Sequence, residues 1–174
     1  VHMLTIRIVP ERAGAEDEAA PKYLDSGALE SPAVALSCAA RETLRMGDEV
    51  REMLESTMKV FSSNDDMLRK QVERSDDLID RLHEAIKLYL TRLSRQELDD
   101  PESRRCVEIL SFTTNLEHVG DIIDKNLLET TRQKIKKQLR FSDEGLQEIE
   151  DLHNRVHNNL RLAMNVFVSG ERPL

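Results

Sequence analysis

The sequence predicts an all-α protein, an up-and-down bundle of long antiparallel helices. One third of its 174 residues are charged, only 3% are aromatic, and Trp is absent. Gly and Pro are scarce, with six and five copies, so little interrupts long helical segments. Apolar residues also recur in alternating steps of three and four, which places them along one face of a helix. A sheet protein of this size would carry more turn residues and more aromatics.

The first two predicted helices begin at recognisable caps. Ser31 followed by Pro32 fits an N-cap and the first helical position. The run of polar residues from Ser63 to Asp66 supplies the next cap and an acidic first turn. The apolar stripe of the first helix is Leu36, Ala40, Thr43, Gly47, Val50, Leu54, Met58 and Phe61, and that of the second is Leu68, Val72, Ser75, Ile79, Leu82, Ile86, Tyr89 and Leu93.

The third and fourth helices are marked in the same way. Asp100 and Pro101 open the third helix, which ends in a basic stretch that reaches Arg140. Ser142 opens the fourth helix and Gly170 closes it. Helices of this length need lengthwise packing on one another. The expected stripes are Ile109, Phe112, Leu116, Val119, Ile123 and Leu127 in the third helix and Ile149, Leu152, Val156, Leu160, Ala163 and Phe167 in the fourth.

An internal repeat divides the chain. Six residues of the first helix recur by identity 106 residues later in the fourth. They are Val50, Leu54, Met58, Val60, Phe61 and Ser63, matched by Val156, Leu160, Met164, Val166, Phe167 and Ser169. We therefore expect a three-helix repeat over residues 31–140 and the first helix of a truncated second repeat over 141–174. Residues 1–30 are expected to be a linker, with a brief strand-like alternation at 4–9.

Composition narrows the function. A formal net charge of −8 and a pI near 5.2 argue against a nucleic-acid partner held through phosphate contacts. Cys38 and Cys106 form neither a disulfide framework nor a zinc-thiolate motif, which favours a reducing compartment. No apolar run reaches the roughly 18 residues of a membrane span, and no secretory signal is apparent, so this piece is expected to be soluble. Nucleophile elbows and glycine-rich phosphate loops are also missing, so no enzyme is expected.

Two acidic rows are the main candidate site. In an antiparallel hairpin, two residues lie at the same height when they are equally far along the chain from the centre of the turn. With that centre between Leu98 and Asp99, three carboxylates on the second helix lie level with three on the third. The expected pairs are Glu73 with Asp124, Asp76 with Asp121, and Asp80 with Glu117. Facing carboxylates repel one another unless a cation lies between them. The rows therefore predict a site for a divalent or trivalent metal ion.

The same residues resemble a known family. The segment Glu117-His-Val-Gly-Asp-Ile-Ile-Asp124 is similar to the E(D)xxxD signature of PhoU proteins, and Asp76-Asp-Leu-Ile-Asp80 is similar to its partner motif. Flanking segments, among them Pro21-Lys-Tyr-Leu-Asp25 and Ser31-Pro-Ala-Val-Ala-Leu36, resemble the cytoplasmic PhoU-like tail of bacterial sodium/phosphate cotransporter proteins. The resemblance covers roughly residues 21–170. In this sequence the second repeat is expected to be truncated after one helix, so only one metal cluster is expected.

The resemblance implies a regulatory domain on the cytoplasmic side of the inner membrane, built of three-helix repeats. Its E(D)xxxD helices would bind Fe, Zn or Mn. Its partners would be a transmembrane phosphate carrier in the same full-length chain and phosphate-signalling proteins. Independently of the resemblance, the stripe of the fourth helix can be only partly covered, because two packing helices are missing, so self-association into a homodimer is a further expectation. It would modulate sodium-dependent phosphate uptake or signalling.

Several alternatives stay open at the level of sequence. The acidic rows could be a solvated bundle face, and the domain could be a helical adaptor without metal that binds a protein through its Met-rich or acidic faces. Gly120 could relieve crowding beside the acidic row or be a plain packing glycine. The basic end of the third helix most simply complements the helix dipole, and the alternative is binding of an anionic lipid or phosphate.

Overall fold

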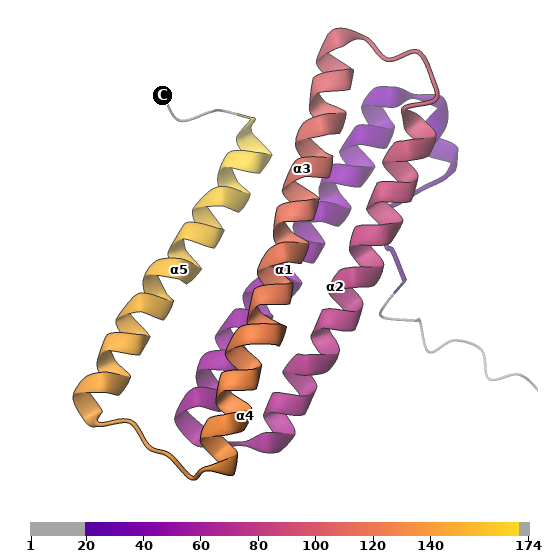
Figure 1. Cartoon of the computed structure of the whole chain (residues 1–174). Helices are drawn as coiled ribbons and strands as arrows, with labels where there is room; N and C mark the ends of the chain where they lie inside the picture. Colours follow the sequence, from indigo (N-terminus) through magenta and orange to yellow (C-terminus); the bar gives the residue numbers. More distant parts are fainter. Residues whose placement is uncertain (1–19, 171–174) are drawn as a thin grey trace, which may run out of the picture.

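A computed structural model describes residues 20–170 and confirms the all-α class. A short 3₁₀ turn, η1 (Gly27–Glu30), precedes the long helices α1 (Pro32–Ser63) and α2 (Asp66–Leu93). A third rod consists of α3 (Asp100–Ile122), a π-helical segment η2 (Ile123–Leu128) and α4 (Glu129–Lys136). The last helix is α5 (Asp143–Ser169). The rods run alternately up and down with short connections (Figure 1). The four predicted helices are thus confirmed, and the third is interrupted by η2.

Local sequence explains where these helices begin. Asp65 caps α2 by accepting hydrogen bonds from the backbone N–H groups of Met67 and Leu68. Asp99 and Glu102 form a reciprocal capping box at the start of α3. By contrast, the Ser31 side chain makes no capping hydrogen bond at α1, where Pro32 follows it. The tight α1–α2 turn places Asn64 at a φ of 59°, a left-handed conformation that Asn tolerates well.

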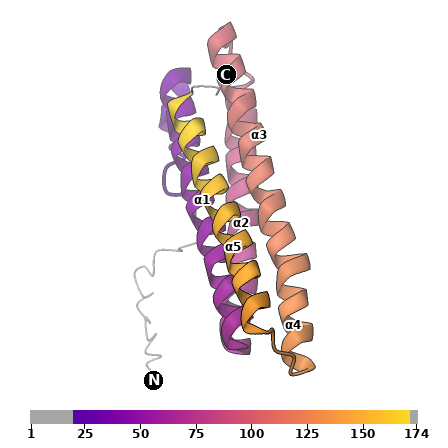
Figure 2. The same ribbon diagram turned by 90° about the vertical axis from the view of Figure 1, so that its left-hand side faces the viewer.

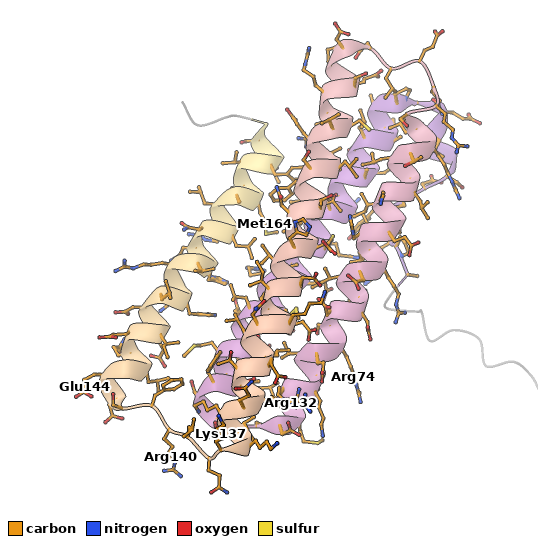
Figure 3. All side chains as sticks on the ribbon, viewed as in Figure 1. Arg74, Arg132, Lys137, Arg140, Glu144 and Met164 are labelled. Carbon is orange, nitrogen blue, oxygen red and sulfur yellow. The ribbon has the colours of Figure 1, made fainter. Side chains whose placement is uncertain are left out.

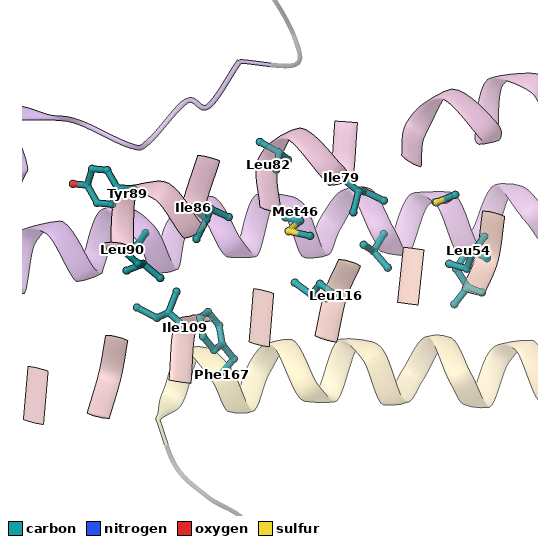
Figure 4. Packing of buried hydrophobic residues seen from close by; sticks show 14 of the residues in the cluster. Met46, Leu54, Ile79, Leu82, Ile86, Tyr89, Leu90, Ile109, Leu116 and Phe167 are labelled. Carbon is teal, nitrogen blue, oxygen red and sulfur yellow. The ribbon is translucent and has the colours of Figure 1, made fainter. Parts of the chain in front are cut away.

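The core lies where α1, α2 and α3 meet along their length (Figure 4). Met46 and Val50 of α1, Ile79 of α2, and Ile109 and Leu116 of α3 are almost completely buried. These residues belong to or adjoin the stripes predicted from the sequence. Burial of large aliphatic side chains stabilises such a bundle by about 1.5 to 3 kcal/mol for each side chain. The three-helix unit therefore carries most of the fold.

Helix α5 lies along α1, and the face that it buries differs from the predicted stripe (Figure 2). Leu152 and Val156 are 63% and 43% exposed. Instead, a ring nitrogen of His153 lies 3.2 Å from the Leu54 carbonyl oxygen, and Met164 packs onto the space left by Gly47. The stripe is only partly covered, as expected for a helix that lacks two of its packing partners: Leu152, Val156 and Ala163 are exposed, whereas Phe167 is buried.

The physical reason is a choice between two neighbouring helix faces. His153 and Met164 each follow a predicted stripe residue by one position, so the docking face includes these neighbours, while Leu160 and Phe167 of the predicted stripe also pack on the core. Gly47 provides the close approach that selects this face, because a Cβ there would lie 2.9 Å from the Met164 Cε atom. The apolar residues turned away from α1 leave an exposed strip along α5.

The segment before α1 is partly anchored to the bundle. The fully buried carboxylate of Glu42 accepts hydrogen bonds from the backbone N–H groups of Lys22 and Tyr23, at 2.9 and 2.6 Å. The Tyr89 hydroxyl on α2 donates to the Asp25 carbonyl at 2.8 Å. We call residues 20–26 the strap. Thus part of the expected linker packs on α1 and α2, and the strand-like stretch at 4–9 lies outside the described residues.

Candidate metal centre between α2 and α3

The acidic rows lie on the α2–α3 hairpin, where the helices approach closely at Gly120. A Cβ at Gly120 would lie 3.2 Å from the Asp76 Oδ1 atom and 3.3 Å from two methyl carbons of Ile79. Such contacts are tighter than ordinary van der Waals distance. The missing side chain of Gly120 therefore makes room for a core side chain, Ile79, and for an acidic one, Asp76. Gly120 is thus both a packing glycine and a residue that relieves crowding beside the acidic row.

The second notable element is the π-helix η2, which contains Asp124. The widened turn follows directly after the acidic residues of α3, and Asp121 lies just before it. π-Helical turns carry one surplus residue and often occur at functional sites. Nothing in the sequence of Ile123–Leu128 indicates a π-helix, because the segment contains neither Gly nor Pro. Sequence reasoning treated it as ordinary α-helix.

Asp76 is the most perturbed carboxyl group of the site. Its pKa is raised from 3.8 to about 6, first by burial and then by the nearby charges of Asp124, Asp80 and Asp121, against an opposing effect of Lys125. Its Oδ1 atom is buried and has no hydrogen-bond partner in the described part of the chain. A buried carboxylate oxygen without a donor is costly, and a cation would satisfy it.

Asp124 shares this environment. Its pKa is raised by burial, and next by the charge of Glu73, whereas Lys125 lowers it. Glu73 is the charge that acts most on Asp124, whereas Asp124, ahead of Asp80 and Asp121, is the charge that acts most on Asp76. The expected facing pairs stay a prediction. Glu117 is half-buried and lies 3.6 Å from His118, and it is not among the charges that dominate these two pKa values.

Two basic side chains occupy part of the acidic row. The Arg69 guanidinium lies 3.2 Å from a Glu73 carboxylate oxygen, and the Lys125 ammonium lies 2.5 Å from the Asp121 Oδ1 atom. In this arrangement, no three His, Cys, Asp or Glu side chains of residues 20–170 converge to hold a metal ion. The sequence reasoning did not consider these basic partners, although both lie at the i, i+4 spacing of helical ion pairs.

The chemistry of the donor set suits a hard cation. A cavity of about 420 Å³ opens beside the hairpin, and its lining consists of Glu73, Asp76, Asp77 and Asp124 together with the basic residues Lys70 and Arg74. Carboxylate oxygens are suitable ligands for divalent and trivalent metals, and Fe and Zn also accept them in mixed shells. The unpartnered Asp76 oxygen gives such an ion a preformed acceptor. Lys125 and Arg69 would have to release their carboxylates, so they compete with the metal for the same oxygens.

The fold and the site thus define the class of domain: an all-α bundle in which one helical hairpin is lined with carboxylates. Comparison with known proteins then identifies the family. Residues 43–129 match the PhoU domain, which is half of the chain and includes all six acidic residues of the two rows. The chain belongs to the PhoU domain family. No solved structure shows a significant match to it.

Related bacterial proteins extend the similarity beyond the domain itself. The chain is 38% identical over 164 residues to a protein of Escherichia coli named "Putative inorganic phosphate export protein YjbB", and 39% identical over 165 residues to its namesake in Salmonella typhimurium. These alignments cover 94% and 95% of the chain. The chain spans about 30% of the length of these relatives. Between residues 20 and 170, no helix combines the length and apolar character required of a membrane span.

Proposed function

We propose that this chain is a metal-responsive regulatory domain of a phosphate-transport protein. Three findings support the proposal: the PhoU family membership, the similarity to proteins named for phosphate export, and the carboxylate rows. The metal is Fe, Zn or Mn, and the ligands are drawn from Glu73, Asp76, Asp80, Glu117, Asp121 and Asp124. The observation that carries the metal proposal is the buried, unpartnered Oδ1 atom of Asp76.

The side chains of the hairpin suggest two charge states. Without metal, Lys125 neutralises Asp121, and Arg69 neutralises Glu73, while the Asp76 carboxyl group keeps a raised pKa. A bound metal would supply the positive charge for all of these carboxylates. The backbones of α2, α3 and η2 would then orient the carboxylates toward the metal, and the Lys125 ammonium would leave Asp121 for solvent. The difference between the states is thus a local rearrangement between α2 and η2.

The strap offers a route from this rearrangement to the rest of a transporter. Tyr89 of α2 and Glu42 of α1 both hold backbone groups of residues 22–25. We propose that the strap leads to the transmembrane part of the same full-length chain, at the cytoplasmic face of the inner membrane. A change in the α2–α3 hairpin would then alter how the strap is held. Sodium as the coupling ion, and phosphate-signalling proteins as further partners, belong to this proposal.

Metal binding can be tested directly with protein purified without chelators. Neutralising the central four carboxylates should abolish binding, whereas neutralising exposed carboxylates of α5 should not. The test protein carries Asp76→Asn, Asp80→Asn, Glu117→Gln and Asp121→Asn, and the control carries Glu148→Gln and Asp151→Asn. Metal bound only to the native fold raises its stability by mass action. We expect Mn, Fe or Zn to raise the Tm of wild type and control, and to leave the fourfold variant unchanged.

The second candidate function is a helical adaptor that binds a protein without metal. The exposed apolar strip of α5 supports this candidate better than the Met-rich face considered from the sequence. Met46 and Met53 are buried in the core, whereas Met67 is 73% exposed, so these residues do not all lie on one exposed face. The exposed strip of α5 containing Leu152 and Val156 is therefore the stronger docking surface, including for a second copy of this chain. Absence of any metal-dependent Tm shift in the wild type would leave the adaptor as the better reading.

A further inference from the structure

A second polar pocket lies at the end of the bundle where α1 ends and α4 turns into α5. Its volume is about 280 Å³. Its lining consists of Phe61, Ser62, Ser63, Asn64, Lys134, Arg140, Phe141 and Leu146. Figure 3 shows Arg140 and Lys137 beside the turn that joins α4 to α5. Two of the lining residues are cationic and none is acidic, so the pocket has the charge of an anion site.

Lys134 is the buried member of this pair. It is 7% exposed, and its ammonium group donates to the Phe61 carbonyl oxygen at 2.8 Å and to the Asn64 Oδ1 atom at 2.6 Å. These bonds satisfy a carbonyl near the C-terminus of α1 and fix the ammonium in place. The ammonium also lies 5.1 Å from the centre of the Phe141 ring, and because it has three donors, one N–H remains for that ring face or for an added acceptor. Lys134 is therefore a rigid, desolvated cation.

The other polar groups of the pocket add hydrogen-bond donors and no negatively charged acceptor. The Arg140 guanidinium and the Asn64 side-chain nitrogen make no hydrogen bond to any residue in the described range. The Ser62 and Ser63 hydroxyls donate to carbonyl oxygens one turn earlier in α1. Guanidinium and amide groups present several N–H donors each. The pocket thus has a surplus of donors as well as of positive charge.

The two cations also act on one another. Burial lowers the pKa of Lys134, and the charge of Arg140 lowers it further. No carboxylate within the described residues forms an ion pair with either group. Like charges that converge on a partly buried pocket without a counter-ion are unfavourable, and an anion between them would reverse the sign of the interaction.

We propose that this pocket binds a phosphoryl oxyanion, held between Lys134 and Arg140. A guanidinium recognises such a group through parallel N–H donors, and a lysine ammonium acts beside it as a point charge. The ligand would be inorganic phosphate or the phosphate of a lipid headgroup, which share this chemistry. The site is separate from the acidic hairpin and needs no metal. It would give a domain of a phosphate-transport protein its own contact with phosphate.

The test is calorimetric titration of the protein with inorganic phosphate in the presence of EDTA. Arg140→Gln removes one cation from the pocket without touching the Lys134 bonds to α1. Lys136→Gln is the matched control, because it removes the same charge from an exposed position outside the pocket lining. Loss of a charge-assisted hydrogen bond should weaken phosphate binding about ten-fold or more in Arg140→Gln. Lys136→Gln should stay within about two-fold of the wild type.

A second arm separates the two sources of phosphate. Co-sedimentation with phosphatidylglycerol vesicles, compared with phosphatidylcholine vesicles, tests the headgroup. Arg140-dependent binding to the anionic vesicles without binding of free phosphate would identify the lipid as the source. Binding in neither arm, or an equal loss in both variants, would overturn the proposed site. The fourfold hairpin variant should bind phosphate like the wild type, so failure of the metal proposal can be distinguished from failure of this one.

Discussion

Replacing Asp76 by Asn should stabilise the metal-free domain at neutral pH. The folded state raises the pKa of this carboxyl group from 3.8 to about 6. At about 1.4 kcal/mol for each pKa unit, the full difference would be about 3 kcal/mol. Solvent screening of this partly exposed group reduces it to about 1 to 2 kcal/mol. Asparagine has a similar shape and no charge, so the variant escapes the cost of ionisation in the fold.

The pH dependence has a definite sign. Between about pH 4 and pH 6 the unfolded chain has released the Asp76 proton and the folded chain still holds it. The free energy of unfolding of the wild type therefore falls as pH rises through this window and is level above it. The Asp76→Asn variant lacks this contribution. The two proteins should be nearly equal in stability near pH 3 and should diverge up to about pH 7.

Urea denaturation in EDTA, followed by circular dichroism at several pH values, measures this difference. Asp151→Asn on the exposed face of α5 is the control and should change stability by less than about 0.5 kcal/mol. With Mn or Zn present the order should reverse, because only the wild type gains from the metal. A variant that is less stable than the wild type at pH 7 in EDTA would show that the buried carboxylate is not an electrostatic cost.

Three further predictions concern neighbouring features. Lys125→Met should tighten metal binding about ten-fold in calorimetry, because the ammonium no longer competes for Asp121, and unchanged affinity would remove Lys125 from the site. Gly120→Ala should lower the free energy of unfolding by about 1 kcal/mol in urea denaturation, since overpacking exceeds the gain in helix propensity, and a more stable variant would contradict the close approach. Self-association through the α5 strip should make sedimentation concentration-dependent and should weaken in Val156→Glu, whereas a strictly monomeric wild type would show that the strip is tolerated in water.

Much of this fold could be read from the sequence because its determinants are local. The cap within Ser63–Asp66, the helix start at Asp100 and Pro101, and the spacing of Ile79, Leu82 and Ile86 each indicate an element from neighbouring residues alone, and the structure places the caps at Asp65 and Asp99. The exact register of the acidic rows stays a prediction, although the order of α2 and α3 and the short turn between them agree with a helical hairpin.

The parts that were missed depend on choices between nearly equal alternatives. Both Leu152 and His153 could have faced α1, and the hollow at Gly47 decided between them. The buried carboxylate of Glu42 was also missed, because an acidic residue in a charged helix gives no sign that a distant backbone segment will satisfy it. Whether the six carboxylates bind metal stays a prediction, since Arg69 and Lys125 engage two of them in the structure.

The π-helix has a consequence for the geometry of the whole third rod. Its surplus residue adds about 100° of rotation to everything that follows, relative to an uninterrupted α-helix. Lys134 reaches the end of α1 only with that rotation included. Deleting a single residue such as Asn126 should restore regular α-helix and leave Lys134 facing Phe61 and Asn64, whereas rewinding η2 to α-helix with all its residues retained would turn Lys134 away from them by about 100°. The six residues of η2, Ile123–Leu128, therefore fix the orientation of the cationic pocket relative to the acidic hairpin. A change in the helical winding of η2 would alter both sites.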